Sequence, residues 1–191
     1  MEQNFFEKNK KILIVVAVVV LLVLWVVGKY NSFITLNENI NNQWAQVDTQ
    51  LQRRFDLIPN VVKTIKGNTK QEKDVFTALA DARTHYAGST TVDQKAKAAG
   101  EVESSLSRLL VIAENYPVLQ SSQAFRDLTV ELEGTENRIS VERMKYNDLV
   151  KSLNTSVKRF PSSIIASIFG IPERAYFEIK DTAKEVPNVD F

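Results

Sequence analysis

An unbroken run of apolar residues, Ile12–Val27, constrains this chain more than any other feature of its sequence. As a helix rising about 1.5 Å per residue, the run spans roughly 24 Å, slightly less than the ~30 Å hydrocarbon core of a bilayer. Trp25 and Tyr30 are residue types that favour membrane interfaces. A buried strand of roughly 4–8 residues is too short to explain the run. We therefore expect residues 12–28 to form a transmembrane helix after a short segment, 1–11.

The flanks of the run bear on whether it is retained and which way it points. A cleaved signal peptide would have small residues at its cleavage site, and Val26–Lys29 reads V-V-G-K, with no A-x-A pattern. Three lysines lie in residues 1–11, whereas Lys29 is the one basic residue between the run and Arg53. By the positive-inside rule we expect a single-pass anchor with its N-terminus in the cytoplasm and the rest of the chain across the membrane.

The composition excludes several classes of function. The chain has 24 basic and 23 acidic residues, and because four of the basic and two of the acidic ones lie in 1–29, residues 30–191 have a net charge of −1. A near-neutral domain has no basic field to hold a phosphate backbone, so we expect no nucleic acid partner. The absence of cysteine excludes disulfides, cysteine-ligated zinc and cysteine nucleophiles.

Beyond the run, apolar residues recur every three or four positions from Phe33 to Ile65. This period predicts a helix of about nine turns, roughly 50 Å long, that continues from the anchor with little or no break. Pro59 falls inside the pattern and is expected to kink or loosen the helix near Phe55–Ile58. The apolar stripe consists of Phe33, Leu36, Ile40, Trp44, Val47, Leu51, Phe55, Ile58, Val62 and Ile65.

Three more helices follow, with capping boxes at Thr69–Glu72 and Thr91–Gln94 opening the first two. We expect these two to end near Gly88 and near Tyr116, and the last to run from Ser121 or Ser122 to Phe160. Two long helices that bracket two shorter ones describe an all-α, antiparallel up-and-down four-helix bundle. The expected bundle domain covers residues 30–170, and an extended tail covers 171–191.

The bundle is expected to close with a short apolar helix, S-S-I-I-A-S-I-F-G, which has Pro161 in its first turn and ends at Gly170. Its apolar segment, Ile164–Phe169, suits the core. A contact surface or a membrane-touching element is the alternative.

Polar residues on the first and last long helices are the candidates for an interaction or structural site. Arg53 and Arg54 are expected to form ion pairs with the acidic last helix, or else to present a hook for an acidic partner or lipid headgroups. Gly134 lies in mid-helix, where glycine costs about 1 kcal/mol relative to alanine, so we expect a neighbouring helix to approach it closely beside Trp44. The candidates are Trp44, Arg53, Arg54, Asp56, Pro59, Glu131, Glu133, Glu136, Asn137 and Arg138.

Groups that carry catalysis are scarce. A di-metal bundle would use a Glu-x-x-His motif, which this sequence does not contain. His85 is the single histidine and is best explained as a surface residue at a helix C-terminus. The sequence also has no P-loop, nucleophile elbow, dinucleotide fingerprint or zinc-protease motif. We therefore expect no catalytic residues, no metal, no cofactor and no enzymatic activity.

The motifs of the bundle resemble those of the LemA family of bacterial membrane proteins. The first helix carries W-A-Q-V-D-x-Q-L-Q-R-R-x-D-L-I-P-N-V-V from Trp44 to Val62, and A-E-x-Y-P-x-L follows from Ala113 to Leu119. The last long helix carries E-L-E-x-T-E-N-R-I and R-x-x-Y-N between Phe125 and Pro161. The resemblance implies a LemA-like helical bundle on one transmembrane helix in the bacterial inner membrane. It implies no mechanism, because the family has no established catalytic activity.

Two functions fit these features. The first is a membrane-anchored, non-enzymatic interaction or scaffold module of the bacterial envelope. Its expected partners are the lipid bilayer, other membrane or envelope proteins, and further copies of the chain. The second is a sensor or regulator linked to envelope stress or membrane proteolysis, in which the long helix transmits a shift to the membrane.

Overall fold

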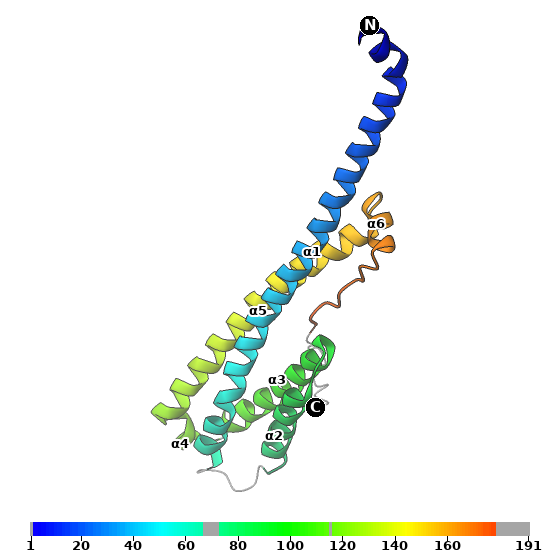
Figure 1. Cartoon of the computed structure of the whole chain (residues 1–191). Coiled ribbons are helices and arrows are strands. Elements are labelled where there is room, and N and C mark those ends of the chain that lie inside the picture. Colours follow the sequence, from blue (N-terminus) through cyan, green and yellow to red (C-terminus); the bar gives the residue numbers. More distant parts are fainter. Residues whose placement is uncertain (1, 67–72, 115, 179–191) are drawn as a thin grey trace, which may run out of the picture. The chain divides into compact units, whose positions relative to one another are not determined.

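The computed structural model describes residues 2–66, 73–114 and 116–178, and every regular element in this part of the chain is a helix (Figure 1). The expected all-α fold is therefore confirmed. The helices are α1 (Glu2–Lys66), α2 (Lys73–Gly88), α3 (Val92–Glu114), α4 (Pro117–Gln120), α5 (Gln123–Lys158) and α6 (Ser162–Ile168). The capping box at Thr69–Glu72 lies outside the described residues.

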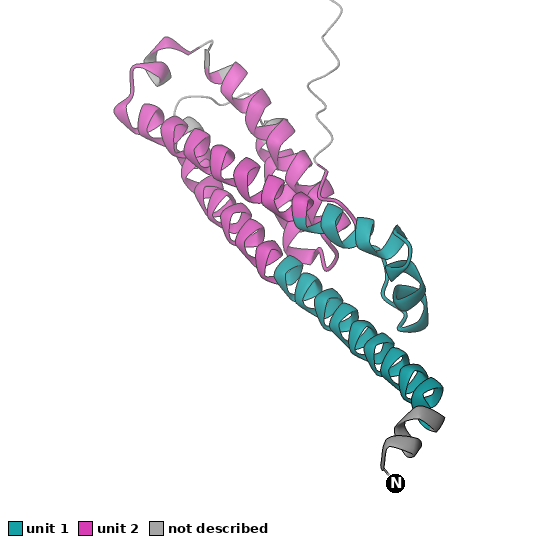
Figure 2. Ribbon diagram, turned by 90° about the horizontal axis from the view of Figure 1, so that it is seen from above, with its two compact units in different colours: residues 1–41, 149–174 teal, residues 42–148, 175–191 magenta. Residues whose placement is uncertain are grey.

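The chain divides into two compact units (Figure 2). Unit 1 comprises Met1–Asn41 and Leu149–Arg174, and unit 2 comprises Asn42–Asp148 and Ala175–Phe191. The boundary between the units cuts through α1 and α5. The domain boundaries expected from the sequence therefore remain predictions.

Helix α1 continues from the apolar run through Pro59 to Lys66 without interruption. The expected continuity with the anchor is thus confirmed, and the proline does not end the helix. Every side chain from Ile12 to Trp25 is exposed. Among the described residues, α1 is the one helix long and apolar enough to cross a membrane, and none of its apolar window is buried.

Unit 2 is built from the second part of α1 with α2, α3 and the first part of α5. Helices α2 and α3 pack side by side as a hairpin. Contacts from Gln43 and Arg54 on α1 to Glu142 and Glu136 on α5 show that these two helices run antiparallel. Most of the core consists of apolar residues that recur along the helices at the helical period. Its best-buried members are Val47, Leu51, Val61, Leu79, Ala82, Val102, Leu106, Leu109, Ala113, Ile139 and Tyr146.

The helix ends follow local chemistry, with small departures from expectation. The capping box of α3 is confirmed. The backbone N–H of Gln94 donates to Thr91 Oγ1 at 3.2 Å, and the backbone N–H of Thr91 donates to Gln94 Oε1 at 3.3 Å. Helix α3 ends at Glu114, and Pro117 opens the single-turn helix α4, which the sequence pattern did not predict. Proline suits such a first turn, because its missing N–H is not needed there.

Unit 1 folds α6 back after the end of α5. The Ser162 hydroxyl donates to the carbonyl of Ser156 at 2.7 Å. At the other end Gly170 has φ +63, its amide donates to Ser167, and the amide of Ile171 donates to Ala166. This is a Schellman ending, which requires the left-handed conformation that glycine adopts without strain.

Two expectations about packing were wrong. A Cβ atom added at Gly134 would meet nothing within 4 Å, so no neighbouring helix explains this glycine. On α1 the stripe shifts after Pro59, because Val61 is 1% exposed whereas Val62 is only half-buried. A helix turns by about 100° per residue, so the buried face of α1 is rotated by roughly that angle from the predicted one after Pro59.

Candidate functional site

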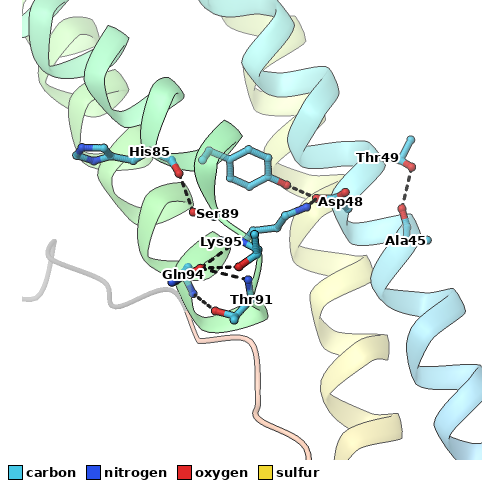
Figure 3. Close-up of polar contacts among 10 residues, drawn as sticks. Ala45, Asp48, Thr49, His85, Ser89, Thr91, Gln94 and Lys95 are labelled. Carbon is cyan, nitrogen blue, oxygen red and sulfur yellow. Dashed lines mark hydrogen bonds and ion pairs between the residues drawn. The ribbon is translucent and has the colours of Figure 1, made fainter.

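A polar network occupies the inside of unit 2, where Asp48 lies on α1. Its carboxylate accepts a hydrogen bond from the Tyr86 hydroxyl on α2 and pairs with the Lys95 ammonium on α3 at 2.6 Å. Figure 3 shows Lys95 extending from α3 toward Asp48 on α1. One carboxylate therefore ties three helices together, and we call these three residues the Asp48 network.

The surroundings of the Asp48 network hold its charges in place. Burial raises the pKa of the Tyr86 phenol far above its ordinary value, and the hydrogen bond to Asp48 adds to this effect, so the phenol stays a donor. The Lys95 ammonium lies 5.3 Å from the Tyr86 ring centroid and 6.0 Å from that of Trp44. Aromatic faces stabilise a cation at such distances. Every charge of the network is thus compensated.

A second polar group, the Arg54 cluster, joins α1 to α3 and α5. Arg54 is 7% exposed, pairs with Glu103 at 2.7 Å and also binds Glu136. Burial raises the pKa of the Glu103 carboxyl, the nearby Arg54 opposes this shift, and Glu136 adds to it. One buried cation therefore balances two carboxylates that would otherwise repel each other, an arrangement that favours this pairing of helices.

Trp44 is the centre of an aromatic contact between α1, α5 and the segment after α6. Its ring lies 5.5 Å from Tyr146 and 5.3 Å from Phe177, both in edge-on geometry. Asn147 fixes the backbone of Phe177 with two hydrogen bonds, of 3.1 and 2.9 Å. Phe177 is 1% exposed, so this part of the predicted surface tail is core instead. A single buried aromatic residue after Pro172 has no periodic signal that the sequence pattern could detect.

Two of the cavities on unit 2 adjoin polar residues. The larger of the two, about 700 Å³, is a groove along α2 and α3, and the small residues Ala78, Ala82, Ala96 and Gly100 are among those that line it. We call it the α2–α3 groove. His85 and Glu101, 2.9 Å apart, lie among its polar lining residues. The smaller, about 340 Å³, lies beside the Asp48 network and includes Asp56 and Arg83.

The charged side chains of these sites join helices to one another. Among the described residues, no group of three or more histidine, aspartate or glutamate side chains is placed to hold a metal ion. The carboxylates of the Asp48 network and the Arg54 cluster are each engaged by a cation or a hydroxyl. Such groups fix the relative positions of the helices.

Comparison with known proteins settles the family. A profile of the LemA family matches residues 43–191, most of the chain. The chain belongs to the LemA family. Similar proteins include Magnetosome protein MamQ 1 and Magnetosome protein MamQ 2 of Paramagnetospirillum magneticum, each 26% identical over 178 residues. Magnetosome protein MamQ of Magnetospirillum gryphiswaldense is 25% identical over 178 residues.

Each of these alignments covers 80% of this chain and 65% of the relative, so the chain spans 65% of the length of the curated relatives that it matches. The family match and the exposed apolar part of α1 together indicate a membrane-associated helical module.

The structure of this LemA-family chain brings together only part of the predicted candidate set. Arg54 and Glu136 meet as expected from an inter-helix ion pair, whereas the neighbouring Arg53 is exposed. Trp44 and Pro59 are half-buried. The remaining candidates are exposed and make no common site: Asp56, Glu131, Glu133, Asn137 and Arg138.

Several residues that complete the sites were missing from the sequence-based candidate set. Glu103, Lys95 and Tyr86 bind Arg54 or Asp48 from α2 and α3. Each of the three lies in an ordinary helical pattern. Pairing across helices depends on rotation and register, which periodicity alone does not supply.

Proposed function

We propose that this LemA-family chain is a non-enzymatic scaffold of the bacterial envelope, anchored in the inner membrane by α1. The observation that carries the proposal is the unbroken helix α1. Its residues 12–25 are apolar and exposed, whereas its later residues form part of a packed bundle. An apolar helix surface that no protein covers is unfavourable in water. It is stable in lipid, because the acyl chains are as apolar as its side chains.

The lysine asymmetry supports an N-terminus in the cytoplasm and unit 2 on the outer side. The α2–α3 groove of unit 2 supports binding of partner proteins, because small residues in its lining leave room for another helix and its polar lining residues can form hydrogen bonds. The similar proteins are named as magnetosome proteins, which is consistent with an organising role here.

The topology is tested with single cysteines, because the natural chain has none. Cysteine replaces Gln3 before the run, or Gly88, where an added Cβ meets nothing within 4 Å. Intact cells are treated with a membrane-impermeant thiol reagent. Labelling at position 88 alone is expected. Labelling at position 3 alone would show the opposite orientation, and partners would then be sought in the cytoplasm.

The scaffold role is tested by photo-crosslinking in cells. A photoreactive amino acid replaces Ala78 or Lys97 in the α2–α3 groove, with Val130, an exposed residue of α5, as the matched control. We expect defined protein adducts from the groove positions that are absent or different from position 130. Failure to recover any protein neighbour from all three positions would overturn the scaffold proposal.

The continuity of α1 favours a sensor or regulator as the second candidate, because one helix carries both the apolar run and part of the bundle. Under this alternative, Pro59→Ala should change a downstream stress or proteolysis response more than it changes the stability of the bundle. Proportional changes in both quantities would count against the sensor.

A further inference from the structure

Helix α6 exposes large apolar side chains along one face. Ile164 and Ile168 are four positions apart in α6, which places them on one side of the helix, and they are 52% and 72% exposed. Phe160, in the turn before the helix, is 77% exposed. Ile165 and Ala166 on the other side are 3% and 2% exposed. The helix therefore packs into unit 1 with one face and presents an apolar face outward.

This face contains no charge. Between Phe160 and Ile171 the chain has no Asp, Glu, Lys or Arg, and the charged residues closest to this stretch are Arg159 before it and Glu173 after it. A surface helix normally carries polar residues outside, and a contiguous apolar patch marks a contact with another molecule or a membrane. We call Phe160, Ile164, Ile168 and the half-exposed Phe169 the α6 apolar face.

The α6 apolar face lies next to the end of the apolar run. The ring of Phe169 contacts that of Tyr30 on α1, with centroids 4.7 Å apart. Tyr30 is three residues after Val27, about 4.5 Å further along the helix axis. Both segments belong to unit 1, so this proximity is a property of one compact body.

The placement of α6 is fixed by specific contacts. Asn154 exchanges two hydrogen bonds of 2.9 Å with the backbone of Arg174, and Lys158 pairs with Glu173 at 2.7 Å. These contacts hold the segment after α6 against α5, and the hydrogen bond from the Ser162 hydroxyl to the Ser156 carbonyl, 2.7 Å, holds the start of α6. The outward apolar face is therefore built into unit 1.

We propose that the α6 apolar face inserts into the interface of the leaflet at which the apolar run of α1 ends, so that the chain contacts the bilayer at two places. The inference rests on the proposed function, since it takes α1 to span the membrane. Interfacial helices bury an apolar face about 5–10 Å deep at the boundary of headgroups and acyl chains, where isoleucine and phenylalanine are stable. Tyr30 then lies at the level of the headgroups, as tyrosine does in aromatic belts.

Lipid fits this face better than a second copy of the chain does. The four side chains expose roughly 400–500 Å², about half of the ~800 Å² per partner in a stable protein interface. None of these four side chains can form a hydrogen bond, whereas a typical protein interface contains several. Its position beside the apolar run makes one continuous surface with an element that already requires lipid.

The test uses the full chain in vesicles of phosphatidylcholine and phosphatidylglycerol, with an environment-sensitive fluorophore on a single cysteine. The cysteine replaces Ile168, Val19 in the middle of the run, or Glu38, an exposed residue of α1 in the same unit. Glu38 lies about 12 Å beyond Tyr30 along the helix axis. Lipids spin-labelled near the headgroup or deep in the acyl chain serve as quenchers.

We expect shallow-lipid quenching at position 168 at least about twofold stronger than at position 38, and deep quenching at position 19. Quenching at 19 together with equal signals at 168 and 38 would overturn the α6 proposal and leave the anchor intact. Absence of quenching at all three positions would overturn the anchor as well. If the fluorophore at position 168 instead became buried from water as the protein-to-lipid ratio rose, without quenching by the lipids, the face would be assigned to contact with a second copy of the chain.

A second variant tests whether the apolar face itself makes the contact. With the fluorophore at position 164, Ile168→Asp should reduce shallow quenching to the level of position 38, whereas Ile168→Val should preserve it. Ile168 is 72% exposed, so neither change disturbs the packing of unit 1. Quenching that survives the aspartate would show that this face does not hold α6 at the membrane.

Discussion

Two stretches of α1 use apolar residues in opposite ways. Between residues 12 and 25 apolar side chains surround the helix and all are exposed, with Leu21 at 66%. In unit 2 they form a stripe in which Val47 is fully buried, and polar residues such as Arg53 occupy the opposite side. An apolar stripe is buried when neighbouring helices pack against it. A helix that is apolar all round and has no protein cover is instead suited to lipid.

Polar groups are distributed in the same contrasting way. Unit 2 places Arg54 and the Asp48 network among its helices, and each is compensated by partners on other helices. The apolar run has no polar side chain at all. A bundle in water needs compensated polar contacts to fix its register, whereas a single helix in lipid satisfies its backbone internally. The following predictions test this contrast, from the largest expected effect to the smallest.

Truncating a buried leucine should destabilise the bundle strongly. Leu132→Ala on α5 removes a side chain that is 4% exposed, and we expect a loss of about 3 kcal/mol in the free energy of unfolding. Urea denaturation of the full chain in detergent measures it. Val130→Ala, at a position 69% exposed on the same helix, should change stability by less than about 0.5 kcal/mol. Equal losses for both variants would contradict the assigned core.

A charge in the middle of the apolar run should prevent membrane integration without affecting the bundle. Val19→Arg is expected to disfavour insertion by about 2.5 kcal/mol, because arginine is poorly solvated by lipid. Alkaline extraction of membranes measures the integrated fraction, with Val19→Leu as the control. Unchanged integration of the arginine variant would argue against a spanning helix.

Removing the buried cation of the Arg54 cluster should destabilise unit 2. Arg54→Met leaves Glu103 and Glu136 without their shared partner, at a cost of about 2 kcal/mol, reduced because both carboxylates are partly exposed. Urea denaturation measures the change. Arg53→Met at the adjacent exposed position is the matched control and should be nearly neutral. A neutral Arg54→Met variant would show that the cluster is dispensable.

Replacing the mid-helix glycine should stabilise the chain. Gly134→Ala places a methyl group in open space and removes the unfavourable helix propensity of glycine, for a gain of about 0.5–1 kcal/mol. Thermal unfolding detects the gain as a higher midpoint. A loss of stability would instead indicate that a neighbouring helix approaches Gly134 closely, as the sequence predicted.

The smallest effect concerns the pH dependence of the Arg54 cluster. The pKa of Glu103 is raised above 4.5 in the folded chain, so its protonated form contributes stability that is lost as the pH rises through the folded-state pKa. Glu103→Gln mimics the protonated form. The free energy of unfolding of the variant, relative to that of the parent chain, should therefore increase from pH 4.5 toward neutral pH. Urea titrations at several pH values measure this difference. Glu131→Gln, at an exposed position of α5, is the control, and a pH-independent difference for Glu103→Gln would contradict the raised pKa.

Local patterns predicted most of the fold. The helical period identified the apolar stripe of α1, and the capping box at Thr91 located the start of α3. Both signals lie within a few residues of chain. The single turn of α4 and the burial of Phe177 escaped prediction, because a four-residue helix and an isolated aromatic residue have no period.

The candidate site was predicted only in part. Arg54 and Glu136 were among the expected residues, but Glu103, Lys95 and Tyr86 were not. Gly134 was assigned a neighbour that it lacks. Each of these outcomes depends on how one helix is rotated against another.

The sequence by itself determined the all-α class, the long apolar stretch of α1 and the family, because these depend on composition, period and short motifs. Only the tertiary structure decided which cation balances which carboxylates, that Phe177 packs against Trp44, and that the outer face of α6 adjoins Tyr30. The physical reason is range. Propensity and periodicity act over a few residues, whereas ion pairs and ring contacts join residues far apart in the chain once helix packing has fixed their register.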